Sequence, residues 1–111
     1  MRSYMIEDLL PEHMHRLAKH LKDKGMASIM DELYWLPVPV ELLSEEQREH
    51  TESCGPHVLG LECGPTWLKM ELLVRGRGRI RCSCVTYATD AQRAHMISSL
   101  DHMLRQLDIP V

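Results

Sequence analysis

The sequence predicts an α+β domain in which a mainly antiparallel sheet packs against helices at the two ends of the chain. Near both ends, apolar residues recur at steps of three and four, the spacing of a single helical face. Between them, residues 57–87 alternate between apolar and polar and are interrupted by glycine-containing turns, which is typical of neighbouring strands. Helices that flank a run of strands in this way favour a segregated α+β arrangement.

The bulk composition fits one globular domain over residues 1–111. The chain of 111 residues has the usual size of a single domain, and 44% apolar with 26% charged residues is an ordinary balance. The formal net charge of −3 gives no general attraction to nucleic acid or to an anionic membrane. We find no stretch typical of a signal peptide or a membrane span, so we expect a cytoplasmic protein with reduced cysteines.

The first predicted helix covers residues 8–25, with Asp8 as its N-cap and Gly25 at its C-terminal cap. The last covers residues 90–108, after a capping box formed by Thr89 and Gln92. Each carries an apolar stripe. The stripes consist of Leu10, Met14, Leu17 and Leu21 in the first helix, and Met96, Ile97, Leu100, Met103, Leu104 and Leu107 in the last.

Two shorter elements are expected between the first helix and the central strands. Residues 33–40 favour a strand, but Pro37 and Pro39 cannot donate ladder hydrogen bonds, so this strand should lie at an edge of the sheet. The pair Ser44 and Gln47 has the form of a capping box and predicts a polar helix over residues 45–53.

The central strands are predicted at 57–63, 67–75 and 79–87, as a three-strand meander. A three-residue turn at Gly76-Arg77-Gly78 would place the apolar faces of the last two strands together. The preceding turn should likewise place the apolar residues of the first two strands on the same face. The expected pairs are Val74 with Ile80, Leu72 with Cys82, Met70 with Cys84, Leu61 with Leu68, and Leu59 with Met70.

The opposite, outer face of this hairpin is unusually apolar for a surface left to water. Trp67 is expected opposite Tyr87, with Leu73 and Val85 on the same side. The first helix, the 33–40 segment or another protein chain should cover these four side chains. They are our candidate partner-binding surface, together with the arginines beside them: Arg75, Arg77, Arg79 and Arg81.

The cysteines and one histidine raise the question of a metal or redox site. Cys54, His57, Cys82 and Cys84 would offer four soft ligands for zinc. Their spacing is not that of a common zinc finger, and the predicted strands separate His57 from Cys82 by about 10 Å. Cys54 and Cys63 should also lie at opposite ends of one strand. This geometry favours Cys82 and Cys84 as small core residues and predicts no cofactor, with zinc or thiol chemistry as the alternative.

No catalytic motif is evident: the sequence has no phosphate-binding glycine loop, nucleophile elbow or HExxH pattern. We therefore assign no catalytic residue. The leading hypothesis is a non-catalytic interaction or regulatory module, associating with itself, as a homodimer, or with another protein through the outer hairpin face. A further alternative is nucleic-acid binding through the four arginines of the hairpin tip, although the acidic chain makes it less favoured.

Overall fold

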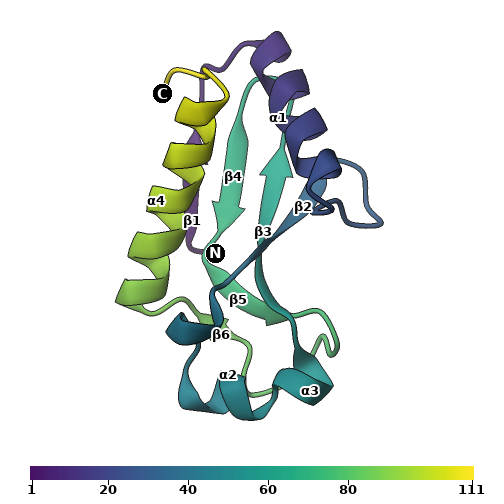
Figure 1. Ribbon diagram of the computed structural model, residues 1–111, viewed down its shortest axis with the longest axis vertical. Coiled ribbons are helices and arrows are strands. Elements are labelled where there is room, and N and C mark those ends of the chain that lie inside the picture. Colours follow the sequence, from purple (N-terminus) through teal and green to yellow (C-terminus); the bar gives the residue numbers. More distant parts are fainter.

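The computed structural model describes all 111 residues and has the predicted α+β fold, with an antiparallel sheet of six strands (Figure 1). The strands are β1 (Ser3–Ile6), β2 (Leu33–Pro37), β3 (His57–Cys63), β4 (Leu68–Glu71), β5 (Leu73–Gly76) and β6 (Thr86–Tyr87). The helices are α1 (Pro11–Asp23), α2 (Glu45–Glu49), α3 (Thr51–Cys54) and α4 (Asp90–Gln106), with a 3-10 turn at Val40–Leu42.

The long strand β3 is the centre of the sheet. One of its edges pairs with β2. The other edge pairs with β5 at the start of β3 and with β4 at its end. Beyond these, β1 pairs with β4 and β6 pairs with β5. The 33–40 segment is thus an edge strand as expected, although its pairing ends at Pro37, opposite Val58.

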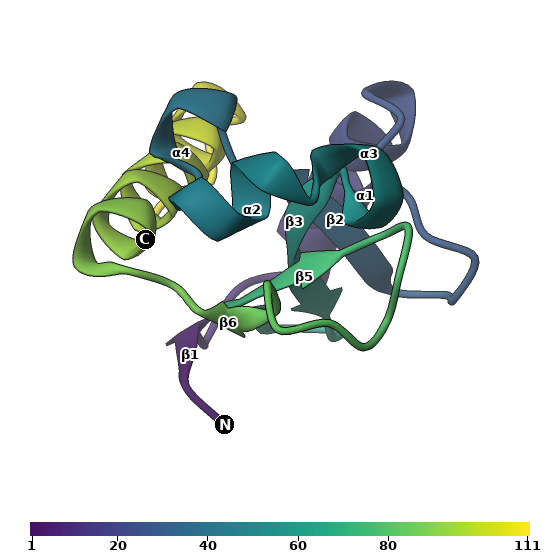
Figure 2. The same ribbon diagram turned by 90° about the horizontal axis from the view of Figure 1, so that it is seen from below.

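All four helices lie on one face of the sheet, and the other face has no helix over it (Figure 2). The apolar stripes of α1 and α4 pack on the inner face, where nineteen buried residues form one core cluster. Leu10, predicted in the first stripe, instead precedes α1 and is 51% exposed. Neither the first helix nor the 33–40 segment, two of the three covers expected for the outer face, lies over it: α1 packs on the inner face and residues 33–37 form a strand of the sheet. The reason is that one helix layer already encloses the apolar inner face, which leaves no helix for the other.

The helix boundaries differ from the predictions for local reasons. Helix α1 begins at Pro11, because proline fits the first turn, where its missing N–H is not needed. Asp8 lies in the left-handed region with φ of 59° and is not the N-cap. The predicted capping boxes at Ser44 and at Thr89 are both present. The 45–53 helix is interrupted at His50, which ends α2 and precedes α3.

The predicted three-residue turn and the strand over 79–87 are not found. Only Thr86 and Tyr87 form a strand, paired with Val74 and Leu73, and residues 77–85 form a long loop. The predicted pairs of Val74, Leu72 and Met70 with residues 80–84, and of Trp67 with Tyr87, are therefore wrong. Ile80, expected inside, is 82% exposed.

The two glycines at the predicted turn serve a different purpose. Neither has a positive φ; instead, the loop passes against the end of α3. A Cβ on Gly76 would lie 2.5 Å from the Cys54 carbonyl oxygen, and one on Gly78 would lie 2.7 Å from that of Ser53. Glycine is required here because two backbones approach closely, a role that sequence alone does not separate from a turn.

The pairing of β3 with β4 keeps the predicted faces but is displaced by two residues. Leu61 pairs with Met70 and Cys63 with Leu68, where we expected Leu61 with Leu68 and Leu59 with Met70. A shift of two leaves every side chain on its original face. The strand β1 was not predicted, because its four residues carry too short a pattern.

Candidate metal centre

Four side chains with metal-binding chemistry converge where α2, α3 and the 77–85 loop meet. Figure 1 shows these three segments together at one end of the molecule. They are His50, Cys54, Cys82 and Cys84, and their ligand atoms all lie within 4.8 Å of one another. In a tetrahedral zinc site with ligands about 2.0–2.3 Å from the ion, neighbouring ligand atoms lie roughly 3.3–3.8 Å apart. The four groups are therefore near the spacing that a single ion requires.

Helical spacing places His50 and Cys54 together. The two residues are four apart, and the Cys54 N–H donates to the His50 carbonyl oxygen at 2.7 Å across one helical turn. Residues at this spacing lie on the same side of a helix. Cys54 is buried, while His50 is half-buried at the junction of α2 and α3.

The 77–85 loop brings the other two ligands to this helical pair. Its first residues are held by two backbone bonds, from the Arg77 N–H to the Pro56 carbonyl and from the Gly78 N–H to the Cys54 carbonyl at 2.8 Å. Further along, the Val85 N–H donates to the Cys82 carbonyl and closes a tight turn. This turn presents Cys82 and Cys84, two residues apart, to the same point.

Two buried glutamines fix the loop from the other side. Gln47 Nε2 donates to the Cys84 carbonyl at 3.3 Å, and Gln92 Nε2 donates to Gln47 Oε1 at 3.0 Å and to the Leu42 carbonyl at 2.8 Å. Each glutamine also caps the start of its own helix, Gln47 in α2 and Gln92 in α4. The metal-binding groups are thus supported by a satisfied polar network that reaches α4.

The thiols of the cluster have unequal acidity. Hydrogen bonds from the Cys84 backbone and from the His50 and Cys84 side chains lower the pKa of Cys82 to about 6. His50 Nδ1 lies 3.0 Å from Cys82 Sγ. Burial, followed by the neighbouring thiols, raises the pKa of Cys84 to about 12. Cys82 therefore loses its proton more readily than an ordinary thiol, and a bound cation would favour the thiolate form of all three cysteines.

Three of the four residues considered for zinc from the sequence are brought together, and His57 is replaced by His50. His57 begins β3 and is only 3% exposed, and neither ring nitrogen has a hydrogen-bond partner. The predicted separation of His57 from Cys82 by about two strand spacings, roughly 10 Å, is not found, because Cys82 lies in a loop and not on a strand. The signal that could have found His50 is its spacing of four from Cys54, which directly follows the predicted 45–53 helix.

The fourth cysteine lies apart, as the sequence predicts. Cys63 ends β3, opposite Leu68, and is not a member of the cluster. Its burial, with smaller contributions from Glu32 and Glu62, raises its pKa to about 12. Cys63 is therefore an unreactive core thiol and a natural control for the other three.

The residues predicted for partner binding are spread over the outer side of the molecule. Leu73 and Tyr87 form a cross-strand pair, and Arg2 lies over the Tyr87 ring at 4.6 Å. Trp67 instead lies in the β3–β4 turn, where its ring packs on Gly64. Val85 follows Cys84 of the candidate metal cluster and is half-buried.

The four predicted arginines differ in their surroundings. Arg75 Nε donates to Glu71 Oε1 at 2.6 Å. Arg77, Arg79 and Arg81 are exposed and have no acidic partner.

Comparison of this chain with known protein families, curated proteins and solved structures found no match. None of its helices is long and apolar enough to cross a membrane. The candidate site is therefore interpreted from its own chemistry.

Proposed function

We propose that this protein is a zinc-binding domain in which His50, Cys54, Cys82 and Cys84 hold one Zn²⁺ as a structural site. The observation that carries the proposal is the convergence of three thiols and one imidazole, from two separate segments, within 4.8 Å. A Cys₃His set is a known structural zinc arrangement. Four protein ligands fill a tetrahedral shell and leave no position for a reacting water, which favours a structural over a catalytic role.

The choice of zinc follows from the ligand types. Thiolates and imidazole are soft or borderline ligands, whereas magnesium and calcium prefer oxygen ligands. No carboxylate belongs to the cluster. A disulfide accounts for the arrangement less well, because it would use only two of the three cysteines and would give His50 no role.

The role proposed for the ion is to join two parts of the fold. It would link the α2–α3 segment to the 77–85 loop, which otherwise lies outside the core: neither Cys54 nor Cys84 belongs to the main core cluster. In small domains such a link contributes directly to folding free energy. The metal would therefore determine the conformation of the arginine-bearing loop.

The test is elemental analysis of protein purified without chelator, with matched substitutions. We expect about one zinc per chain in the wild-type protein and in Cys63→Ala, and a loss of zinc in Cys84→Ala and Cys54→Ala. The sharpest comparison uses the two histidines: His50→Gln should lose most of the zinc, and His57→Gln should keep it. Wild-type protein without metal after refolding in zinc, or a loss in His57→Gln alone, would contradict the proposal.

A second role, protein–protein association through the outer sheet face, is favoured by the absence of any helix over that face (Figure 2). The exposed apolar side chains there include Met5 and Tyr87, exposed by 46% and 39%. The association could be with a second copy of the chain or with a different protein, and light scattering over a wide concentration range distinguishes these two. A protein that stays monomeric would exclude self-association and leave a different partner.

A further inference from the structure

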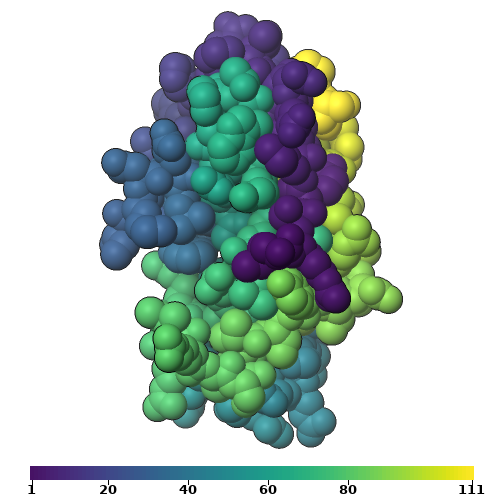
Figure 3. Space-filling view, turned by 180° about the vertical axis from the view of Figure 1, so that it is seen from behind, coloured from purple at the N-terminus to yellow at the C-terminus, as the bar shows by residue number.

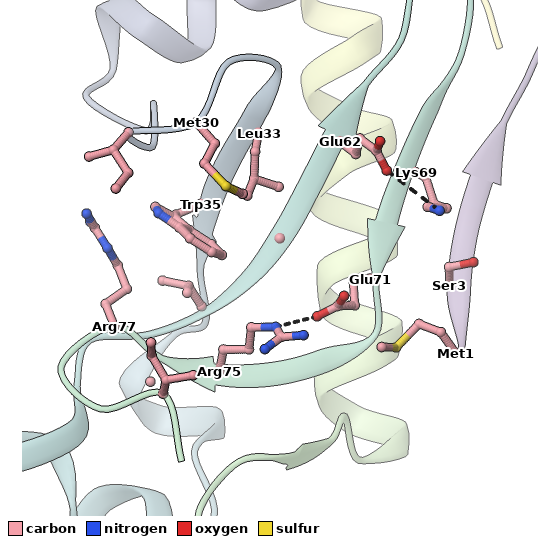
Figure 4. Close-up of a pocket in the computed structure, with 15 residues that line it drawn as sticks. Met1, Ser3, Met30, Leu33, Trp35, Glu62, Lys69, Glu71, Arg75 and Arg77 are labelled. Carbon is pink, nitrogen blue, oxygen red and sulfur yellow. Dashed lines mark hydrogen bonds and ion pairs between the residues drawn. The ribbon is translucent and has the colours of Figure 1, made fainter. Parts of the chain in front are cut away.

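The outer face of the sheet contains a groove of about 720 Å³ that the metal site does not use (Figures 3 and 4). Its floor is formed by outward residues of β2, β3, β4 and β5, and the Trp35 ring lies towards one end, between Met30 and Arg77 (Figure 4). One wall is the loop before β2, which carries Ile29 and Met30. The other wall is the start of the 77–85 loop, which contributes Arg77 and Ile80.

Three large apolar side chains at the groove are exposed to solvent. Ile29, Met30 and Ile80 are exposed by 104%, 58% and 82%. They lie on the two walls on either side of Trp35, which is itself half-buried. A concave apolar surface of this kind, with polar groups at its rim, is typical of a binding site.

The charges around the groove are balanced at one end and unbalanced at the other. The acids of the sheet are paired, Glu62 with Lys69 at 3.6 Å and Glu71 with Arg75 at 2.6 Å (Figure 4). Arg77 has no acidic partner, nor have Arg79 and Arg81 in the same loop. Asp31 and Glu32, in the loop before β2, are also unpaired, but they do not line this groove. Among the charged side chains that line it, only Arg77 lacks a partner of opposite charge, so the complementary ligand is an anion.

We propose that this groove binds an acidic peptide segment, with an apolar side chain over Trp35 and carboxylates against Arg77 and its neighbouring arginines. Arginine recognises carboxylates through paired N–H donors, and an apolar anchor in a hollow supplies most of the affinity in such interfaces. This inference goes beyond the metal site, and its test does not require the ligand set of that site to be correct.

The observations favour a peptide over the two other macromolecular occupants. Nucleic acid would bring phosphates close to Glu62 and Glu71, and only one aromatic ring is available for base stacking. A second copy of this chain, seated face to face, would bring another set of unpaired arginines to the same interface. Only an acidic partner neutralises the charge that the groove leaves uncompensated.

The chain provides a built-in reporter, because it has two tryptophans and only Trp35 lines the groove. In Trp67→Phe, the remaining intrinsic fluorescence comes from Trp35. In the matched variant Trp35→Phe it comes from Trp67, in the β3–β4 turn. Far-ultraviolet circular dichroism establishes that both variants are folded.

The experiment is a selection of random 12-residue peptides displayed on phage, followed by titration of the enriched peptide into the two single-tryptophan variants. We expect a consensus with Asp or Glu near a large apolar residue. The emission of Trp35 should change on binding, and that of Trp67 should not. In the Trp67→Phe background, Arg77→Glu should weaken binding roughly tenfold, whereas Arg93→Glu, the same charge change on α4, should leave it within about twofold.

Several results would overturn the proposal. These are the absence of any enriched consensus, a basic consensus, or equal effects of the Arg77 and Arg93 reversals. Two further outcomes would assign the groove to another occupant. A single-stranded oligonucleotide that alters Trp35 emission while the peptide does not would indicate nucleic acid. A concentration-dependent Trp35 change without peptide, matched by dimer formation, would indicate a second copy.

Discussion

His57 is the most unusual single residue of the molecule outside the metal cluster. Its imidazole is buried at the start of β3 with both nitrogens unpaired. Burial, and then the nearby His50, lower its pKa below the ordinary value of 6.5. An unpaired buried polar group costs stability, typically about 1–3 kcal/mol. Metal binding does not compensate for this loss of stability, because His57 lies outside the candidate metal cluster.

We therefore expect His57→Leu to raise the free energy of unfolding of the metal-free protein by about 1 kcal/mol at pH 7.5. The substitution should also make the free energy of unfolding fall less between pH 7.5 and pH 5.5 than it does in the wild-type protein. The lowered folded-state pKa means that the unfolded chain takes up a proton first, so wild-type stability is lost as pH falls from about 6.5 towards the folded pKa. Urea unfolding at pH 7.5 and 5.5 measures both effects. His102→Leu, an exposed histidine on α4, is the control. Equal pH dependence in His57→Leu and wild-type would contradict the prediction.

At the scale of elements, the 77–85 loop depends on close backbone contact with α3. We expect Gly78→Ala to destabilise the metal-loaded protein by about 1–3 kcal/mol and to weaken zinc binding, because its Cβ would meet the Ser53 carbonyl oxygen at 2.7 Å. Competition with a chromogenic chelator and thermal unfolding measure the two effects.

Gly60→Ala is the matched control for this loop prediction. The nearest atoms to an added Cβ there belong to side chains at 3.5 and 3.6 Å, an ordinary contact. This variant should stay within about 0.5 kcal/mol of wild-type and keep its zinc affinity. Similar losses in both glycine variants would mean that loop docking is not the cause.

Sequence reasoning succeeded for the elements whose apolar pattern is long. The stripes of α1 and α4, both capping boxes and strand β3 are encoded locally and could be predicted. It failed for the stretch from Gly76 to Val85, because glycines that allow close packing have the same sequence signature as glycines in a turn. That single error placed Cys82 and Cys84 on a strand and hid their convergence with His50. It also hid the groove, since Ile80 was assigned to the core.

At the scale of the whole molecule, the proposed metal and the proposed groove share one loop. The loop provides Arg77 and Ile80 to the groove and Cys82 and Cys84 to the metal cluster. Anything that releases the cysteines should therefore disturb the groove wall that contains Arg77 and Ile80. The main core, which excludes Cys54 and Cys84, should be affected much less.

We expect removal of zinc by a strong chelator to lower the melting temperature by roughly 10 °C while the helical circular dichroism signal is largely retained. In Trp67→Phe, chelation should weaken peptide binding at least severalfold, and added zinc should restore it. His50→Gln should show the weaker binding without chelator. Unchanged peptide affinity in the metal-free protein would show that the two sites are independent, even if each is real.

The exposed segment Arg79-Ile80-Arg81 is held at both of its ends. On one side the Gly78 N–H donates to the Cys54 carbonyl, and on the other Cys82 belongs to the candidate metal cluster. With the metal in place, this exposed segment is a short closed loop that has already lost much of its conformational freedom during folding. A partner that meets it encounters side chains on a restrained backbone, so little further entropy is lost on binding. The metal would then act on affinity at a distance, by preorganising a surface that it does not touch.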